Sequence, residues 1–177
     1  MFRGLGAAIV DADEATHEVY APGTSGFDEI VRTFGREYVR DGQIDRARLG
    51  ELVFQDSNAR QRLNAIVHPR VRDWMAERTA EAIDGGAEVV IQDIPLLFEN
   101  DLQRLFSSTV LVYAPAATQI DRLVAERGLS LARANSMLAS QMPIDEKTAL
   151  ADFVIDNNGG IEETRRQVAD IWPQISR

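Results

Sequence analysis

The sequence predicts an α/β protein built on a parallel β-sheet. Four short runs are rich in apolar and β-branched residues, which is typical of buried strands, and helical patterns separate each run from the next. Strands that alternate with helices form a parallel sheet that helices cover on both faces. The four predicted strands are residues 7–11, 87–93, 109–113 and 152–155.

Length and composition are those of one globular domain. The chain has 177 residues, of which 45% are hydrophobic and 27% charged, so residues 1–177 are predicted to form a single domain. The sequence has no cysteine, which excludes disulfides and thiol catalysis. No apolar run reaches the length of a membrane span, and the N-terminal residues turn acidic too soon for a signal peptide. We therefore expect a soluble, cytoplasmic protein.

The charge balance argues against two classes of partner. A formal net charge of −9 repels nucleic acid and anionic membranes. All but one of the 19 basic residues are arginine, the exception being Lys147. This bias has two explanations, which are genome composition and the bidentate binding of phosphate in a pocket.

A long helical insertion is predicted between the first two strands. The 75 residues from Ala12 to Gly86 contain no good strand and are too many for an ordinary crossover connection. Pro69 is interpreted as the permitted first residue of the last helix in this insertion. The predicted helices are 28–34, 45–54, 57–67 and 69–83, within an insertion at about 12–86.

A second helical segment follows the third strand. Pro115 opens a helix that ends at Gly128, and Ser130 caps another helix. Because this pair of helices is charged and lies between two strands, it is predicted to fold over a site as a lid at about 115–147. The C-terminal segment 161–171 is predicted to be an amphipathic helix.

Carboxylates follow two of the predicted strands. Asp11 and Asp13 come at the end of the first strand, and Asp93 comes at the end of the second. The carboxyl ends of parallel strands meet at one edge of the sheet, where α/β proteins bind ligands. One carboxylate there can hold a metal ion while another accepts a proton. The alternative is that an aspartate at a strand-to-helix junction only caps the helix.

Other polar residues have a functional and a structural interpretation. His68 either binds a ligand or acts as a base, or it only caps the following helix or is a polar residue with its hydrogen bonds satisfied. Arg122 and Arg127 lie on or beside the lid helix, where they either bind phosphate or form a solvated surface. The exposed amides of residues 156–160 either contact a base or a phosphate or form a plain turn. Glu99 is a polar residue in an otherwise apolar segment after the second strand.

The chain contains no Walker A motif. That phosphate-binding loop needs the spacing G-x-x-x-x-G-K-[ST], and the only lysine, Lys147, lies in a helical pattern instead. Gly4 and Gly6 precede a strand rather than follow one. We interpret them as the end of a truncated helix that leads into the first strand.

Four segments, taken in order, resemble the motif series of the dephospho-CoA kinases, which are P-loop kinases of the nucleoside-monophosphate-kinase type. The resemblance extends from Gly4 to about Trp172 and rests on VDADEATHEVYAPG, LNAIVHPRVR, IQDIPLLFEN and QMPIDEKTALADFVIDNNG. It implies a parallel sheet of that kinase type, with a helical CoA-binding insertion and a helical lid. It also implies that ATP, with Mg²⁺, phosphorylates the ribose 3′-hydroxyl of dephospho-CoA, the last step of coenzyme A synthesis.

The resemblance implies roles for individual residues. Asp13 would accept or orient the proton of the attacking hydroxyl, and Asp11 and Asp93 would act at the metal. Arg122 and Arg127 resemble lid arginines that close over the phosphates. Which of them contacts phosphate stays open, because many relatives place that arginine one position before Arg127. The residues implied for substrate binding are Arg62, Asn64, His68 and Glu99, and those implied for ATP binding are Lys147, Asn157 and Gly159.

The largest departure from the family pattern is at the start of the chain. Relatives begin with a strand, a P-loop and the first turns of a helix, so about 20 residues are expected to be absent here. The chain as given is therefore predicted to be an inactive, truncated kinase, and the alternative is a non-catalytic remnant that binds dephospho-CoA or CoA. The retained acids and arginines favour the kinase. If the absent segment supplies a central strand, the fragment should show a gap between neighbouring strands or a closed-up sheet.

Overall fold

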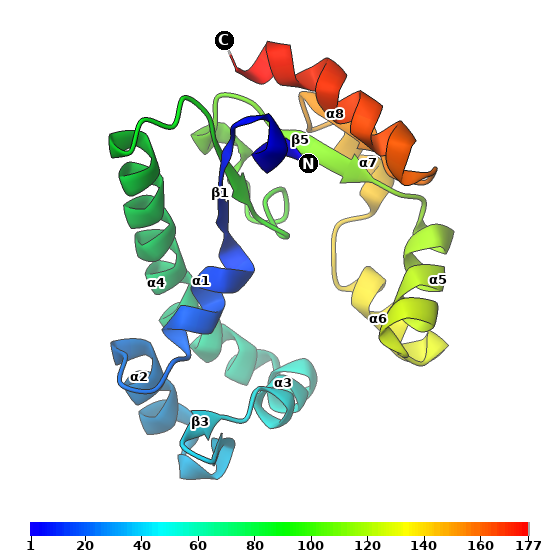
Figure 1. Ribbon diagram of the computed structural model, residues 1–177. Coiled ribbons are helices and arrows are strands. Elements are labelled where there is room, and N and C mark those ends of the chain that lie inside the picture. Colours follow the sequence, from blue (N-terminus) through cyan, green and yellow to red (C-terminus); the bar gives the residue numbers. More distant parts are fainter. Residues whose placement is uncertain (177) are drawn as a thin grey trace. The chain divides into compact units, whose positions relative to one another are not determined.

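The computed structural model describes residues 1–176, which divide into two compact units. One unit is Ala7–Ile94, and the other joins Met1–Gly6 to the chain from Pro95 onward. Figure 1 labels the main elements of both units.

The first unit combines a parallel strand pair with four helices. β1 (Ala8–Asp11) pairs with β4 (Val90–Asp93) in parallel. α1 follows directly after β1 and begins the long segment that connects the two strands. α4 contacts the other three helices and both strands of the pair. The helices are α1 (Ala12–Val19), α2 (Ser25–Phe34), α3 (Arg46–Gln55) and α4 (Ser57–Asp84).

Apolar side chains hold the first unit together in two clusters. The larger cluster lies among α2, α3 and α4 and contains Ile30 and Leu49, whose side chains are fully buried. The smaller cluster joins Val10 of β1, Ala15 of α1 and Met75 of α4. Because this second cluster fixes the end of β1 against α1 and α4, it positions the acidic residues at the β1–α1 junction.

The predicted boundary between two helices at Pro69 is wrong. α4 is one helix of 28 residues, and Pro69 lies inside it. Proline removes one backbone hydrogen bond from a helix and bends it, and α4 changes direction along its length in Figure 1. The guanidinium of Arg70 donates a 2.8 Å hydrogen bond to the carbonyl of Ile66. A side chain therefore supplies a hydrogen-bond donor close to Pro69, which has no backbone N–H. The apolar face formed by Leu63, Ile66 and Val67 keeps the helix packed through the bend.

The segment 12–86, predicted to contain no good strand, contains one short hairpin. β2 (Val39–Arg40) and β3 (Gln43–Ile44) form a short antiparallel hairpin after the 3₁₀ turn η2 (Arg36–Tyr38). Its two turn residues, Asp41 and Gly42, have φ angles of 51° and 78°. Positive φ at both positions is the geometry of a type I′ turn, which Asp-Gly pairs favour. The flanking strands are too short to show an alternating pattern in the sequence.

The second unit also contains a parallel strand pair. β5 (Val110–Tyr113) pairs with β6 (Phe153–Asp156), and α8 (Ile161–Ile175) packs on β6 and on η1 (Phe2–Leu5), as Figure 1 shows. Ile155, Val168 and Ile171 form its core. The rings of Phe2 and Trp172 lie 6.3 Å apart between centroids, which ties η1 to α8. The remaining elements are α5 (Ala116–Arg127), α6 (Leu131–Ala139), α7 (Ile144–Thr148) and the 3₁₀ turn η3 (Gln103–Leu105).

The four predicted strands are confirmed to within three residues at each end, and both pairings are parallel. Within residues 1–176 they form two separate pairs, with no hydrogen-bonded ladder from one pair to the other. The two helices of the predicted lid begin as expected, after Pro115 and after the Ser130 cap, whose hydroxyl accepts from the Arg133 amide. None of the helices in the described part of the chain is long and apolar enough to cross a membrane.

Candidate active site

Three aspartates lie at the carboxyl ends of β1 and β4. Asp11 and Asp93 are directly opposite each other as the last residue pair of the two strands. The carboxylate of Asp11 accepts a 2.8 Å hydrogen bond from the backbone N–H of Asp13, so Asp11 is the N-cap of α1. The capping interpretation is therefore confirmed for Asp11. It does not apply to Asp13, which lies in the first turn of the helix.

The surroundings of Asp93 make ionisation of its carboxyl unfavourable. Desolvation raises the pKa of the Asp93 carboxyl, and the negative charges of Asp11 and Asp13 raise it further. Like charges that approach this closely favour either a bound cation or a proton between them. Negative charge is therefore concentrated at the junction of β1 with α1.

The residues predicted on α4 divide between two of its faces. Asn64 and His68 are one helical turn apart, exposed, and on the same side of α4. Arg62 lies about 200° away from Asn64 around the helix axis, and its guanidinium lies 5.3 Å from the ring centroid of Phe34. The structure therefore brings Asn64 and His68 together, whereas it places Arg62 against a core aromatic ring.

His68 does not cap a helix, because α4 continues on both sides of it. The capping interpretation of this residue is wrong. Desolvation lowers the pKa of the His68 imidazole, and the positive charge of Arg72, one turn further along α4, lowers it further. At neutral pH the ring is therefore mainly uncharged, and one of its nitrogens is available as a hydrogen-bond acceptor.

The two predicted lid arginines of α5 have different surroundings. Arg122 Nη2 donates a 2.7 Å hydrogen bond to the backbone carbonyl of Asn157. Arg127 is the last residue of α5, is exposed, and makes no ion pair or hydrogen bond through its side chain within residues 1–176. Residues five positions apart project about 140° from each other on a helix. The structure therefore does not bring the two guanidinium groups together.

The loop after β6 is held by contacts on both sides. The Asn157 amide N–H donates to the carbonyl of Tyr113 at 2.7 Å, and its side-chain oxygen accepts from the Thr164 hydroxyl at 3.1 Å. The Thr118 hydroxyl donates to the side-chain oxygen of Asn158 at 2.6 Å. Gly159 is exposed at the tip. The loop is a well-braced turn that leads into α8.

Comparison with known proteins identifies the family of the chain. The family model for dephospho-CoA kinase matches residues 1–163. The chain belongs to the dephospho-CoA kinase family. A dephospho-CoA kinase of Listeria monocytogenes is 44% identical over 169 residues, which are 95% of this chain and 84% of that protein. One of Anaeromyxobacter dehalogenans is 46% identical over 163 residues, which are 92% of this chain and 77% of that protein.

Solved structures show the same fold. A crystal structure from Thermus thermophilus has a TM-score of 0.84 and 31% identity, and covers 98% of this chain and 87% of its own. A dephospho-CoA kinase from Campylobacter jejuni has a TM-score of 0.69 and 27% identity, with the same two coverages. These similarities confirm the predicted fold class, an α/β fold with parallel strands that is typical of P-loop kinases.

The acidic residues suit a magnesium ion that arrives with a nucleotide. Within residues 1–176 no group of three His, Cys, Asp or Glu residues is arranged to hold a metal ion alone. Mg²⁺ usually takes one or two protein carboxylates and completes its shell with water and substrate phosphates. The opposed pair Asp11 and Asp93 fits that pattern, because a divalent cation would favour the ionised form of Asp93, which desolvation and the charges of Asp11 and Asp13 disfavour.

Glu99 and Lys147 form a buried ion pair instead of lining an open site. The Lys147 ammonium lies 2.6 Å from Glu99 Oε1, and the two side chains are only 7% and 16% exposed. The same oxygen accepts a 3.1 Å hydrogen bond from the Met142 amide. Burial pushes the pKa of the Glu99 carboxyl upward, but the hydrogen bonds and the charge of Lys147 leave it below its ordinary value. The predicted substrate contact of Glu99 and the predicted ATP contact of Lys147 stay predictions beside this ion pair.

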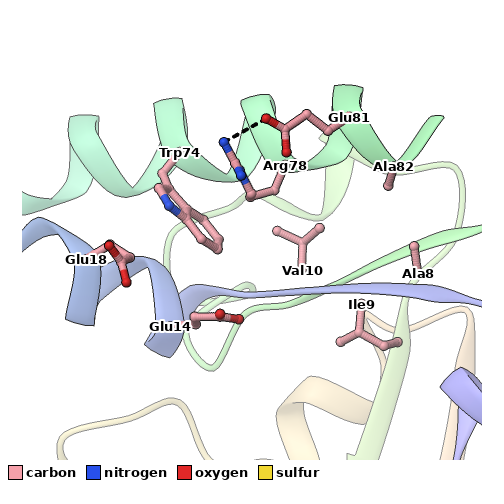
Figure 2. Close-up of a pocket in the computed structure, with 9 residues that line it drawn as sticks. All are labelled: Ala8, Ile9, Val10, Glu14, Glu18, Trp74, Arg78, Glu81 and Ala82. Atoms are coloured by element: carbon pink, nitrogen blue, oxygen red, sulfur yellow. Dashed lines mark ion pairs between the residues drawn. The ribbon is translucent and has the colours of Figure 1, made fainter. Parts of the chain in front are cut away.

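A cavity of about 700 Å³ lies beside β1, and no sequence pattern predicted it. Figure 2 shows it between β1, α1 and α4, with Glu14, Glu18 and Trp74 on its wall. Its one cation, Arg78, is 2.8 Å from Glu81 and 5.6 Å from the Trp74 ring centroid. Because the arginine is already neutralised and the other charged groups are acidic, this cavity is not suited to a phosphorylated substrate.

Proposed function

We propose that this chain supplies the acceptor site and the lid of a kinase that transfers the γ-phosphoryl group of ATP to the ribose 3′-hydroxyl of dephospho-CoA. The observation that carries the proposal is the grouping of Asp11, Asp13 and Asp93 at the ends of two paired parallel strands. Ligand sites of open α/β sheets lie at these strand ends. Membership of the dephospho-CoA kinase family supports the choice of acceptor.

In this proposal Asp13 positions the acceptor and takes its proton. The 3′-oxygen forms a bond to the γ-phosphorus, the bond from that phosphorus to the β,γ-bridging oxygen breaks, and ADP leaves. The proton of the 3′-hydroxyl passes to the Asp13 carboxylate. Asp13 suits the task because its backbone is held by the Asp11 cap, so its carboxylate is presented from a fixed helix turn.

Asp11 and Asp93 would hold Mg²⁺. The ion would supply charge neutralisation for the phosphates. What the chain contributes is the spacing of the two carboxylates, which the register of β1 with β4 determines.

The different contacts of Arg122 and Arg127 suggest a different role for each of them. Arg127 would contact the phosphates, because its guanidinium is exposed and has no partner in the described chain. Arg122 would brace the loop of Asn157 and Gly159 against the adenine, because its guanidinium already holds the Asn157 carbonyl. Asn64 and His68 would contact the acceptor, and Arg62 would join them only after leaving Phe34.

A second candidate is binding of dephospho-CoA without phosphoryl transfer by these 177 residues. It is favoured by the position of Lys147. A kinase P-loop uses a lysine to neutralise the phosphates, and the only lysine of this chain is buried against Glu99. The acceptor residues do not depend on that lysine.

The proposed function is tested in a longer version that carries a strand and a P-loop before residue 1. That version is incubated with ATP, Mg²⁺ and dephospho-CoA, and ³¹P NMR determines which oxygen of the product carries the new phosphate. The proposal predicts a 3′-phosphate. Phosphate on another oxygen, or transfer to adenosine but not to dephospho-CoA, would contradict it.

A further inference from the structure

The cavity beside β1 combines an acidic wall with the backbone of a strand. Residues 8–10 of β1 line it, and Trp74 of α4 supplies an aromatic wall (Figure 2). Three carboxylates and one guanidinium also line it, which gives the cavity a net formal charge of −2. These charged side chains are Glu14, Glu18, Glu81 and Arg78. None of the residues implied for the active site lies in this cavity.

One backbone edge of β1 has no neighbouring strand within residues 1–176. The Ala8 amide donates a 3.0 Å hydrogen bond to the Val89 carbonyl, so residues 8 and 10 direct their N–H and C=O groups toward β4. Ile9 lies between them and directs its N–H and C=O groups away from β4, where the described chain has no further strand. Ile9 lines the cavity although its side chain points away from α4 (Figure 2), as expected if its backbone edge borders the cavity.

The edge of β6 that faces away from β5 is closed by a side chain. The Asp156 amide donates a 2.8 Å hydrogen bond to Gln167 Oε1, and Gln167 Nε2 donates a 2.8 Å hydrogen bond to the Asp156 carbonyl. The glutamine amide therefore takes the place of a neighbouring strand. Native proteins block strand edges in such ways because an open edge pairs with other chains. No side chain of the described residues blocks Ile9 in this way.

The two carboxylates that α1 contributes to the cavity have no partner. Glu14 and Glu18 are one helical turn apart and exposed, and within residues 1–176 neither side chain makes a hydrogen bond or an ion pair. Like charges at this spacing destabilise a helix. Glu81, by contrast, is paired with Arg78 at 2.8 Å. Two uncompensated negative charges therefore lie beside the open edge of β1.

We propose that this cavity binds an extended segment of a partner protein in which every second residue is Lys or Arg. The segment would lie along β1 as an additional strand, and its backbone would form hydrogen bonds with the N–H and C=O groups of Ile9. Alternate side chains of a strand project to the same face. The basic side chains of the segment would therefore reach Glu14 and Glu18 together, and the Trp74 ring would pack on their aliphatic stems.

Charge complementarity favours a basic partner over a second copy of this chain. The chain has a net charge of −9 and a single lysine, so an acidic cavity repels most of its surface. The inference does not depend on the proposed function, because none of the residues that carry it is assigned to phosphoryl transfer or to binding of either substrate.

Calorimetry on the 177-residue chain tests the inference with short peptides that are blocked at both ends. The probe alternates lysine with valine, and it is expected to bind saturably and to slow hydrogen exchange at the Ile9 amide. A peptide that alternates glutamate with valine should not bind. The lysine peptide with every backbone nitrogen methylated keeps its charge but cannot donate to a strand, so it should bind at least about tenfold more weakly.

Two variants of the chain separate the backbone contact from the charge contact. Ile9→Pro removes an N–H that does not bond to β4, and it should weaken binding of the lysine peptide about fivefold. Val154→Pro is the matched control, because the Val154 N–H also points away from its partner strand and lies outside the cavity. Its affinity should equal that of the unaltered chain.

Glu14→Gln/Glu18→Gln should also weaken binding of the lysine peptide about fivefold, and the difference from the unaltered chain should shrink as salt is added. The matched control replaces two exposed glutamates outside the cavity, Glu51→Gln/Glu126→Gln, and should leave the affinity unchanged. Circular dichroism checks that each variant is folded. If Ile9→Pro does not fold, hydrogen exchange at the Ile9 amide of the unaltered chain decides the backbone contact.

Three results would overturn the inference. The first is failure of the lysine peptide to bind the unaltered chain. The second is equal binding of the methylated peptide, or unchanged exchange at the Ile9 amide, because either would leave only a general attraction between charges. The third is a dimer in sedimentation equilibrium that the lysine peptide dissociates, because a second copy of the chain would then be the natural occupant of this edge.

Discussion

Asp11 and Asp93 face each other as the last residue pair of two parallel strands, β1 and β4. The carboxylate of Asp11 also caps α1, which presents Asp13 beside the pair. The register of the two strands and the helix cap therefore bring three acidic residues together. Asp93 is separated from the other two in the sequence by the whole helical insertion.

Replacement of Asp13 by asparagine tests its role as the proton acceptor. In the longer version with a P-loop, Asp13→Asn is expected to lower kcat by at least about 10²-fold and to leave ATP affinity nearly unchanged, because a positioned base contributes about 10²–10⁴. Steady-state kinetics and ATP titration measure the two effects. Glu14→Gln, one residue further along α1, is the control and should retain activity. An unchanged kcat for Asp13→Asn would return this residue to a purely structural role.

The raised pKa of Asp93, which desolvation and the charges of Asp11 and Asp13 cause, predicts a pH-dependent change in stability. Folding raises the pKa of Asp93, so the folded chain binds a proton there more tightly than the unfolded chain does. Ionised Asp93 therefore disfavours folding at any pH above the raised pKa. Asp93→Asn should raise Tm at neutral pH by about 1–2 °C, a small effect because Asp93 is exposed and its repulsion is screened.

The gain in Tm should disappear as the pH falls below the ordinary aspartate pKa of about 3.9, where Asp93 is protonated in both states. Asp73→Asn, at an exposed position of α4, is the control. Calorimetric melting between pH 3 and pH 8 would show the difference. A gain from Asp93→Asn that does not depend on pH would argue against a raised pKa of Asp93 in the folded chain.

The buried pair of Glu99 and Lys147 predicts strong coupling between two substitutions. Lys147→Met leaves the Glu99 carboxylate buried without its partner and should cost about 3–5 kcal/mol of unfolding free energy. Adding Glu99→Leu should recover much of that loss. Arg165→Met is the control, because it breaks an exposed pair with Glu162 that is worth about 1 kcal/mol or less. Additive effects of the two buried substitutions in urea unfolding would contradict the coupling.

The same pair predicts a loss of stability in acid. Folding lowers the pKa of the Glu99 carboxyl, so its contribution is complete above the ordinary glutamate pKa of about 4.3 and is lost as the pH falls through the lowered value. Urea unfolding across that range should show a decline that is absent from Lys147→Met/Glu99→Leu. An identical acid decline in both chains would assign it to other groups.

The two lid arginines should respond differently to replacement. In the longer version, Arg127→Ala is expected to lower kcat by about 10³-fold or more, as the loss of a phosphate-contacting arginine does, without changing the loop after β6. Arg122→Ala removes the 2.7 Å contact to the Asn157 carbonyl and should mainly raise the KM for ATP. Hydrogen exchange at residues 156–160 should rise only in Arg122→Ala. The reverse pattern would exchange the two roles.

Local sequence patterns predicted the strands, the Asp11 cap and the lid helix starts, because each of these depends on neighbouring residues. The continuation of α4 through Pro69 was not predictable in the same way, since packing of the apolar face of α4 outweighs the local cost of a proline. The contacts that Arg62 and Lys147 make within the chain were not predictable for a related reason. Their partners, Phe34 and Glu99, are distant in sequence, and no local pattern reveals such pairs.

The most direct test of the account is calorimetric titration of the 177-residue chain with dephospho-CoA and with ATP, followed by a coupled kinase assay. The acceptor residues lie in the chain, whereas no Walker A loop does, and the only lysine is buried against Glu99. The account predicts measurable binding of dephospho-CoA, much weaker binding of ATP, and no formation of coenzyme A. ATP-dependent formation of coenzyme A by these residues alone, or the absence of dephospho-CoA binding, would contradict it.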